Sequence, residues 1–158
     1  MIDQAMDIAI AYLIKPSEAY ATALPDGSCT AYPDPASSGD PWTIGFGSTG
    51  PDIKPGTIWS RDMAETRLRK KVVYFTNRVL KMSPILAKDG YEYKLAAIIS
   101  FAYNLGDGNY FASTLKRRVN EENWEAAAVE CRKWNKARGK ILRGLTIRRN
   151  LESQCLLK

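Results

Sequence analysis

The chain has 158 residues, a net charge of +6 and no histidine, and these three facts limit its fold and chemistry. Its hydrophobic share of 45% and charged share of 25% are typical of a soluble globular protein, and no apolar run is long enough to span a membrane. The lack of histidine excludes Ser-His-Asp and Cys-His nucleophilic systems and His-ligated metal sites. Carboxylates, Lys, Tyr or Cys would have to move any protons.

The positive charge favours an anionic partner, such as nucleic acid, an acidic membrane surface or an acidic polysaccharide. Charge alone does not choose among these three. Residues 1–15 lack the basic start of a signal peptide and contain two aspartates. We therefore expect synthesis in a cytoplasm.

The three cysteines, Cys29, Cys131 and Cys155, are an odd number without CxxC spacing. This pattern predicts free or buried thiols rather than a disulfide or a metal site. A bridge from Cys155 to either of the other two remains the alternative, and it would require an oxidising compartment.

The N-terminal segment carries apolar residues at helical spacing. These residues recur on one face from position 2 to position 14, which predicts an amphipathic helix over residues 2–14. Pro16 predicts that this helix ends or is interrupted by Lys15. Glu18 would then lie just past the helix, beside apolar surface.

Residues 24–43 are rich in Pro, Asp and Gly, a composition typical of turns. Two short stretches beside these turns, 29–32 and 42–46, are rich in strand-forming residues. They predict a small antiparallel sheet. A purely structural hairpin would give the same pattern, so the sheet by itself predicts no chemistry.

The rest of the chain is predicted to be mainly helical. Ser60 is a candidate N-cap for a helix over 60–81. Further helices are expected over 91–103, from 113 or 114 to 119, from about 123, and from about 146. The last helix is expected to bury Ile147, Leu151 and Cys155, and residues 136–140 are expected to form a basic connector.

These elements predict an α+β, predominantly helical fold in a single domain over residues 1–158. We expect a β-containing lobe over about 15–59 and a long linking helix over about 60–81. A helical lobe would comprise about 82–158 together with the helix over 2–14.

Several carboxylates gather in the loop-rich region before residue 50. Together with the lack of histidine and the basic charge, they suggest glycoside hydrolysis, in which one carboxyl protonates the leaving oxygen and a second group manages water or positive charge. Apolar surface beside Glu18 would raise the pKa of its carboxyl towards that of a useful acid. A solvated surface acid is the simpler alternative for Glu18.

Several strings along the chain resemble phage-type lysozymes, the muramidase family of bacteriophage endolysins. The resemblance starts at Glu18 and covers nearly the whole chain in the family's order. The strings are AYPDP (31–35), WTIGFGSTG (42–50), IKPGT (53–57), SFAYNLG (100–106), STLKRRVN (113–120), AAAVECRKWNKARGKILRGL (126–145) and IRRNLE (147–152).

This resemblance implies a two-lobed lysozyme fold with the substrate cleft between the lobes. It also implies cleavage of the β-1,4 bond between N-acetylmuramic acid and N-acetylglucosamine in peptidoglycan, without a metal or cofactor. Glu18 would be the general acid, and Asp34 would orient the attacking water or stabilise positive charge. Thr43 would help to hold that water, and Arg148 would approach the glutamate from the helical lobe. The family is usually regarded as inverting, which requires roughly 6.5–9.5 Å between the two carboxyl groups.

The sequence departs from the family's pattern in its spacing and at two positions. Fifteen residues separate Glu18 from Asp34, more than is usual, and the stretches ATALPDGS (21–28) and SSGD (37–40) resemble insertions. Asp26 or Asp40 could therefore replace Asp34 as the catalytic aspartate.

Ser48 stands where the family often has a histidine, so an ion pair to the helical lobe would be lost. Ala19 stands where a glycine commonly follows the glutamate. Tyr32 and Ser48 are expected to support substrate binding.

The expected partner is the glycan strand of peptidoglycan, whose anionic polymers would attract the +6 charge. We expect a monomer that inserts into no membrane, binds no nucleic acid, and leaves the host cytoplasm through a separate membrane pore protein to act on the wall in the periplasm. The alternatives are a lytic transglycosylase that uses Glu18 alone and a catalytically silent wall-binding module. A basic nucleic-acid-binding protein is disfavoured because most aromatic residues lie in predicted core stripes.

Overall fold

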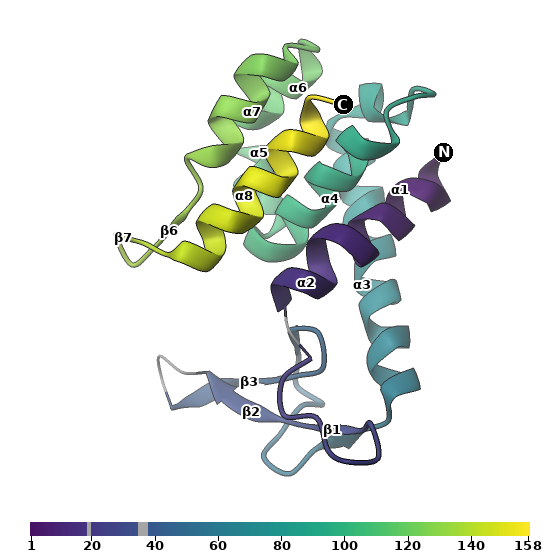
Figure 1. Ribbon diagram of the computed structural model, residues 1–158, viewed down its shortest axis with the longest axis vertical. Coiled ribbons are helices and arrows are strands. Elements are labelled where there is room, and N and C mark those ends of the chain that lie inside the picture. Colours follow the sequence, from purple (N-terminus) through teal and green to yellow (C-terminus); the bar gives the residue numbers. More distant parts are fainter. Residues whose placement is uncertain (19, 35–37) are drawn as a thin grey trace. The chain divides into compact units, whose positions relative to one another are not determined.

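The computed structural model describes residues 1–18, 20–34 and 38–158 (Figure 1). The chain divides into two compact units, the helical unit (1–17 and 72–158) and the β unit (18–71). Helix α3 (Arg61–Met82) begins in the β unit and ends in the helical unit. The predicted α+β, predominantly helical fold is confirmed, including the long helix that joins a small β-containing part to a helical part. That the whole chain acts as one domain stays a prediction.

Helix α4 (Glu92–Leu105) forms the centre of the helical unit. Ten consecutive residues of this helix, 94–103, are buried, so the helix is enclosed on all its faces. The helix expected over 91–103 is confirmed. The N-terminal helix and α8 (Arg143–Leu156) pack on α4 from two sides (Figure 1). The unit also contains η2 (Pro84–Ala87), α5 (Asp107–Phe111), α6 (Thr114–Asn120) and α7 (Trp124–Arg132).

The N-terminal helix changes its geometry along its length. It runs as α1 (Ile2–Ile8), the π-helix η1 (Ala9–Ile14) and α2 (Lys15–Glu18). The predicted interruption by Lys15 is confirmed by this change of geometry, but the helix does not end there, because Glu18 still belongs to α2 instead of lying beyond the helix. Pro16 would clash with the carbonyl four residues earlier in a regular α-helix. The amide of Lys15 reaches back five residues to the carbonyl of Ile10, and this wider turn accommodates the proline.

The C-terminal part differs from the prediction in three ways. The stretch 136–140 is not a plain connector, because β6 (Lys136–Ala137) and β7 (Lys140–Ile141) form a hairpin. Helix α8 begins before residue 146 because the hairpin delivers an extended Leu142 as its N-cap residue. Ile147 is 51% exposed, so its predicted burial is wrong. Arginine and glutamate side chains take the inward positions of α8, as described below.

The β unit contains two small antiparallel sheets. Strand β1 (Cys29–Thr30) pairs with β5 (Ile58–Trp59), and the order β2-β3-β4 defines a three-stranded sheet. The strands of that sheet are β2 (Tyr32–Asp34), β3 (Gly39–Ile44) and β4 (Ser48–Thr49). The predicted antiparallel sheet is confirmed, but the expected strand over 29–32 is divided between the two sheets at Ala31.

The start of α3 supports the sheet from within the β unit. The Ser60 hydroxyl accepts a hydrogen bond from the Met63 amide at 3.1 Å, as expected of an N-cap. Gly45 lies so close to the helix that a β-carbon built on it would be 3.1 Å from the Ala64 β-carbon. Ile44, the last residue of β3, is fully buried, so the sheet is fixed where β3 ends.

All three cysteines are free and buried, as predicted. Within the described ranges, no helix combines the length and apolar character that crossing a bilayer requires.

Candidate active site

The carboxylate of Glu18 lies against the turn between β3 and β4. A β-carbon built on Gly47 would be 2.6 Å from Oε2 of Glu18 and 3.3 Å from its Cδ. Gly47 also has a φ of +77°, which side-chain-bearing residues rarely adopt. Only glycine fits both requirements. Gly47 was not among the predicted site residues, although its place in WTIGFGSTG, directly after a predicted strand, was a signal.

Tyr32 connects Glu18 to the sheet. Burial raises the pKa of the Tyr32 phenol, and the negative charge of Glu18 raises that pKa further. The phenol therefore stays neutral and able to donate a hydrogen bond near the carboxylate. In the sheet, Tyr32 is directly opposite Thr43, which places both residues beside one another in neighbouring strands.

Thr43 occupies the central strand of this sheet. It is in register with Tyr32 of β2 on one side and with Thr49 of β4 on the other. Its hydroxyl donates to the carbonyl of Pro41 at 3.4 Å, which is long for such a bond. A hydroxyl held this loosely can turn towards another acceptor. Through Tyr32, the structure connects two of the three predicted catalytic residues, Glu18 and Thr43.

The three candidate aspartates have different surroundings. Asp34 ends β2, is partly buried and follows Tyr32 by two residues, with a register shift between them. Asp40 is exposed in β3. The Asp26 carboxylate accepts hydrogen bonds from the amide and hydroxyl of Ser28, and these bonds lower its pKa. The Asp26 carboxylate therefore stabilises the turn in which it lies.

The stretch 21–28, which resembles an insertion, forms a self-contained loop. The Leu24 amide donates to the Ser28 carbonyl at 2.7 Å, and the Gly27 amide donates to the Leu24 carbonyl at 2.9 Å. The Thr30 amide bonds to the Thr22 carbonyl at 3.3 Å and so brings the two ends together. The other predicted departures and motif positions at Ala19, Pro35 and Ser37 lie outside the described residues.

Lys71 holds the turn that contacts Glu18. Its ammonium group, on the partly buried face of α3, donates to the carbonyl of Gly47 at 3.4 Å. The neighbouring Ser48, which stands where the family often has a histidine, is buried and in register with Ile44. A lysine thus supports the turn from α3, and sequence reasoning missed it because it lies 24 residues away in the chain.

Arg148 belongs to the helical unit and is buried there. Its Nε donates to the hydroxyl of Ser100 at 3.3 Å and to Oε1 of Glu152 at 3.4 Å. The fully buried Arg149 donates to the same carboxylate oxygen at 2.8 Å and to Oδ1 of Asn104 at 3.2 Å. The spacing of Arg148, Arg149 and Glu152 in IRRNLE was the available signal for this network. The role of Arg148 towards Glu18 stays a prediction.

The β unit places a carboxylate and a neutral phenol near one another, at Glu18 and Tyr32, and both groups can take part in proton transfer. Thr43 carries a hydroxyl on the strand opposite Tyr32. Over the described ranges, no group of three or more His, Cys, Asp or Glu side chains could hold a metal ion. A glutamate against the turn of a small antiparallel sheet, in a chain whose long helix α3 continues into a helical unit, is the arrangement expected of a lysozyme-like protein.

Comparison with known proteins gives the family. The phage lysozyme family model matches residues 26–152, and the chain belongs to this family. It is 40% identical to the endolysin of Bacillus phage B103 over 116 residues, which are 73% of this chain and 43% of that protein. The chain thus spans less than half of the length of that relative.

Two further relatives support the assignment. The SAR-endolysin of bacteriophage PS119 is 33% identical over 73% of this chain and 67% of its own length. The solved structure of the endolysin from Escherichia coli O157:H7 phage FAHEc1 matches with a TM-score of 0.75 and 26% identity. That match covers 98% of this chain and 91% of the other.

Proposed function

We propose that the protein is an endolysin that hydrolyses the β-1,4 bond between N-acetylmuramic acid and N-acetylglucosamine in peptidoglycan. The observation that carries this proposal is the Glu18 carboxylate held against Gly47 and beside Tyr32, in a chain of the phage lysozyme family. The endolysin names of its relatives support the same activity.

In the proposed reaction, protonated Glu18 donates its proton to the oxygen that leaves the anomeric carbon. The bond between that carbon and oxygen breaks, and positive charge develops on the sugar ring. Water then adds its oxygen to the anomeric carbon, and its proton passes to a carboxylate. Asp34 would orient this water or stabilise the charge, and Thr43 would help to position the water. Arg148 would support Glu18.

Asp34 is the preferred aspartate because of its neighbours. It shares β2 with Tyr32, whose pKa responds to the charge of Glu18. Asp26 is a weaker candidate because Ser28 already occupies its carboxylate. Asp40 remains the alternative within the same sheet.

The proposed place of action is the cell wall in the periplasm, reached from the host cytoplasm through a separate pore protein. The net charge of +6 would speed encounter with anionic wall polymers, and added salt would weaken this effect. We propose that the protein acts as a monomer and as a single domain over residues 1–158, with Tyr32 and Ser48 supporting substrate binding.

The decisive test compares wild type with Glu18→Gln in a turbidity assay on outer-membrane-permeabilised cells. Loss of the acid should lower the rate about 10²- to 10⁴-fold without changing the melting temperature. Glu65→Gln is a matched control in the β unit, where Glu65 forms an i,i+4 pair with Arg61. Equal lysis by wild type and Glu18→Gln would refute catalysis and favour a wall-binding module.

Analysis of the products separates hydrolysis from transglycosylation. Mass spectrometry of digested peptidoglycan should reveal reducing ends, whereas 1,6-anhydro ends would establish the transglycosylase alternative. Among Asp26→Asn, Asp34→Asn and Asp40→Asn, the Asp34 variant should lose the most activity. A larger loss of activity in Asp40→Asn than in Asp34→Asn would indicate that Asp40 is the catalytic aspartate.

A further inference from the structure

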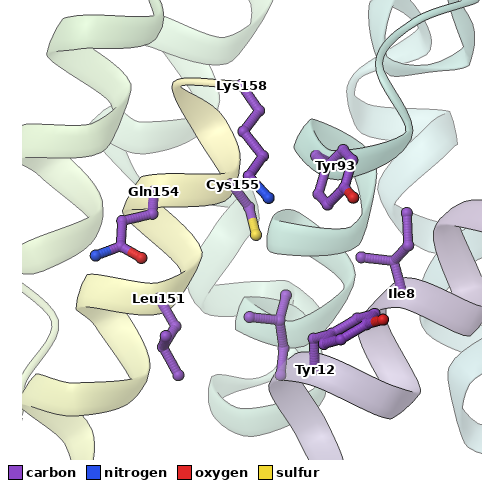
Figure 2. Close-up of a pocket in the computed structure, with 8 residues that line it drawn as sticks. Ile8, Tyr12, Tyr93, Leu151, Gln154, Cys155 and Lys158 are labelled. Carbon is purple, nitrogen blue, oxygen red and sulfur yellow. The ribbon is translucent and has the colours of Figure 1, made fainter.

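The helical unit contains a pocket of about 340 Å³, and neither Glu18 nor Thr43 is among the residues that line it (Figure 2). Its walls come from the N-terminal helix, from α4 and from the C-terminal part of α8. Tyr12 and Leu13 of η1 line one wall, and Tyr93 of α4 and Leu151 of α8 line others. Neither the proposed mechanism nor the family assignment uses this pocket.

The pocket combines an apolar lining with one cation. Among the residues that line it, Lys158 has the only charged side chain, and its ammonium nitrogen lies 4.0 Å from the centre of the Tyr93 ring. Burial raises the pKa of the Cys155 thiol, while the charge of Lys158 acts in the opposite direction. The Lys158 nitrogen and the Cys155 sulfur point into the same space (Figure 2).

The π-helix η1 is an independent sign of a site. π-Helical residues make up well under 1% of soluble proteins and occur frequently at functional sites. Here η1 forms a wall of the pocket, and it leaves Tyr12 66% exposed beside the buried Leu13. An aromatic ring thus stands at the edge of the pocket while its neighbour completes the core.

We propose that this pocket binds a single acyl chain that carries one negative charge at its head. The aliphatic and aromatic lining fits the chain, and the Lys158 ammonium fits a carboxylate or phosphate. The volume lies near the lower end of the range of about 300–1,000 Å³ for ligand pockets, so the chain is short or enters only in part. Its source is either a free medium-chain fatty acid or an anionic lipid. This proposal is independent of the proposed function.

Octanoate is the first probe, and its binding is measured through the amide chemical shifts of the whole chain. Ligands of this size bind small pockets with dissociation constants on the order of 1 mM. The shifts should concentrate on Leu13, Tyr93 and Leu151. A second readout is alkylation of Cys155, which is 8% exposed whereas Cys29 and Cys131 are shielded almost completely. Octanoate should slow this alkylation, measured by peptide mass spectrometry.

Variants test the two halves of the site. Lys158→Gln should weaken octanoate binding about two- to fivefold and leave the binding of uncharged octanol unchanged. Lys133→Gln is the matched control, since Lys133 pairs with Glu130 and does not line the pocket. Leu151→Trp should fill the pocket and abolish the binding of both octanoate and octanol. The melting temperature of Leu151→Trp verifies that this variant folds. If the variant does not fold, Lys158→Gln provides the test.

The proposal is overturned if octanoate causes no shifts at the pocket and no protection of Cys155, or if Lys158→Gln and Lys133→Gln bind octanoate equally. Phosphatidylglycerol vesicles then distinguish the two sources. Protection of Cys155 by vesicles, lost in Leu151→Trp, would assign the acyl chain to an anionic membrane lipid. Protection by octanoate but not by vesicles would assign it to a free fatty acid.

Discussion

The two units of the molecule are stabilised in different ways. The helical unit buries ten consecutive residues of α4 and a network of charged side chains around Glu152. The β unit has strands of two to six residues, and its ion pair between Arg67 and Asp52 is solvent-exposed. The candidate acid is the last residue of α2, at the start of the β unit, and its neighbours lie on a turn and short strands. The candidate site thus lies where the backbone can take unusual conformations, while the helical unit supplies the larger core.

The largest effect on stability is expected from Glu152→Ala. This change leaves the guanidinium groups of Arg148 and Arg149 buried without their shared carboxylate. Removal of one partner of a buried ion pair costs about 3–5 kcal/mol, measurable by urea unfolding. Glu121→Ala removes the exposed pair with Arg118 and should cost less than about 1 kcal/mol. If Glu152→Ala and Glu121→Ala lowered the free energy of unfolding equally, the contrast between buried and exposed charges would be contradicted.

Gly47→Ala should affect activity more than stability. The new β-carbon would displace the Glu18 carboxylate, and a misplacement of about 1 Å can lower a rate about 100-fold. The positive φ adds about 1–2 kcal/mol of strain. Gly56→Ala is the matched control, because Gly56 has a φ of +82° but nothing within 4 Å of its added β-carbon. If both variants lose activity equally, contact with Glu18 is not the cause.

Lys71→Met tests whether α3 positions the turn. The loss of the bond to the Gly47 carbonyl should reduce kcat about fivefold and leave KM nearly unchanged. Lys71→Arg keeps a hydrogen-bond donor at this position and should retain most of the wild-type activity. If only the aliphatic stem of Lys71 mattered, Lys71→Met would retain as much activity as Lys71→Arg. Lys70→Met, at an exposed neighbouring position, is the control. An unchanged kcat in Lys71→Met would remove Lys71 from the candidate site.

The smallest effect is a pH-dependent one in the helical unit. Hydrogen bonds from Tyr91 and Lys88 lower the pKa of Glu122 below its ordinary value of 4.5. Because the pKa is lower in the folded state, the ionised Glu122 stabilises the protein fully at pH values above its ordinary pKa. This stabilisation is lost as the pH falls through the folded-state pKa. Glu122→Gln should therefore lower the melting temperature by about 1 °C at pH 7, with the difference vanishing in acid. A difference that grows below pH 4.5 would contradict this assignment.

Sequence periodicity predicted most helices because their apolar residues recur at helical spacing. The start of α3 was readable from the Ser60 cap, and α4 from its apolar residues. The family strings located Glu18 and Thr43, and the structure connects both through Tyr32. That their roles are catalytic stays a prediction.

The features that were missed depend on partners distant in the chain. Lys71 meets Gly47 across 24 residues, and the requirement for glycine there comes from a positive φ together with the approach of Glu18. Arg149 is buried against Asn104, which lies 45 residues away, and against Phe101, whose ring centre is 4.9 Å from the guanidinium carbon. Neither hydrophobic periodicity nor composition reports such pairings.

The loop over residues 21–28 has a practical consequence. Its internal hydrogen bonds and the contact between Thr30 and Thr22 close it before β1 begins. The cost of closing a loop rises only slowly with its length. Exposed tips of this kind tolerate inserted peptides, so the exposed Pro25 offers a place to graft a wall-targeting or affinity sequence. The stretch that resembles an insertion is thus also an attachment point for engineering.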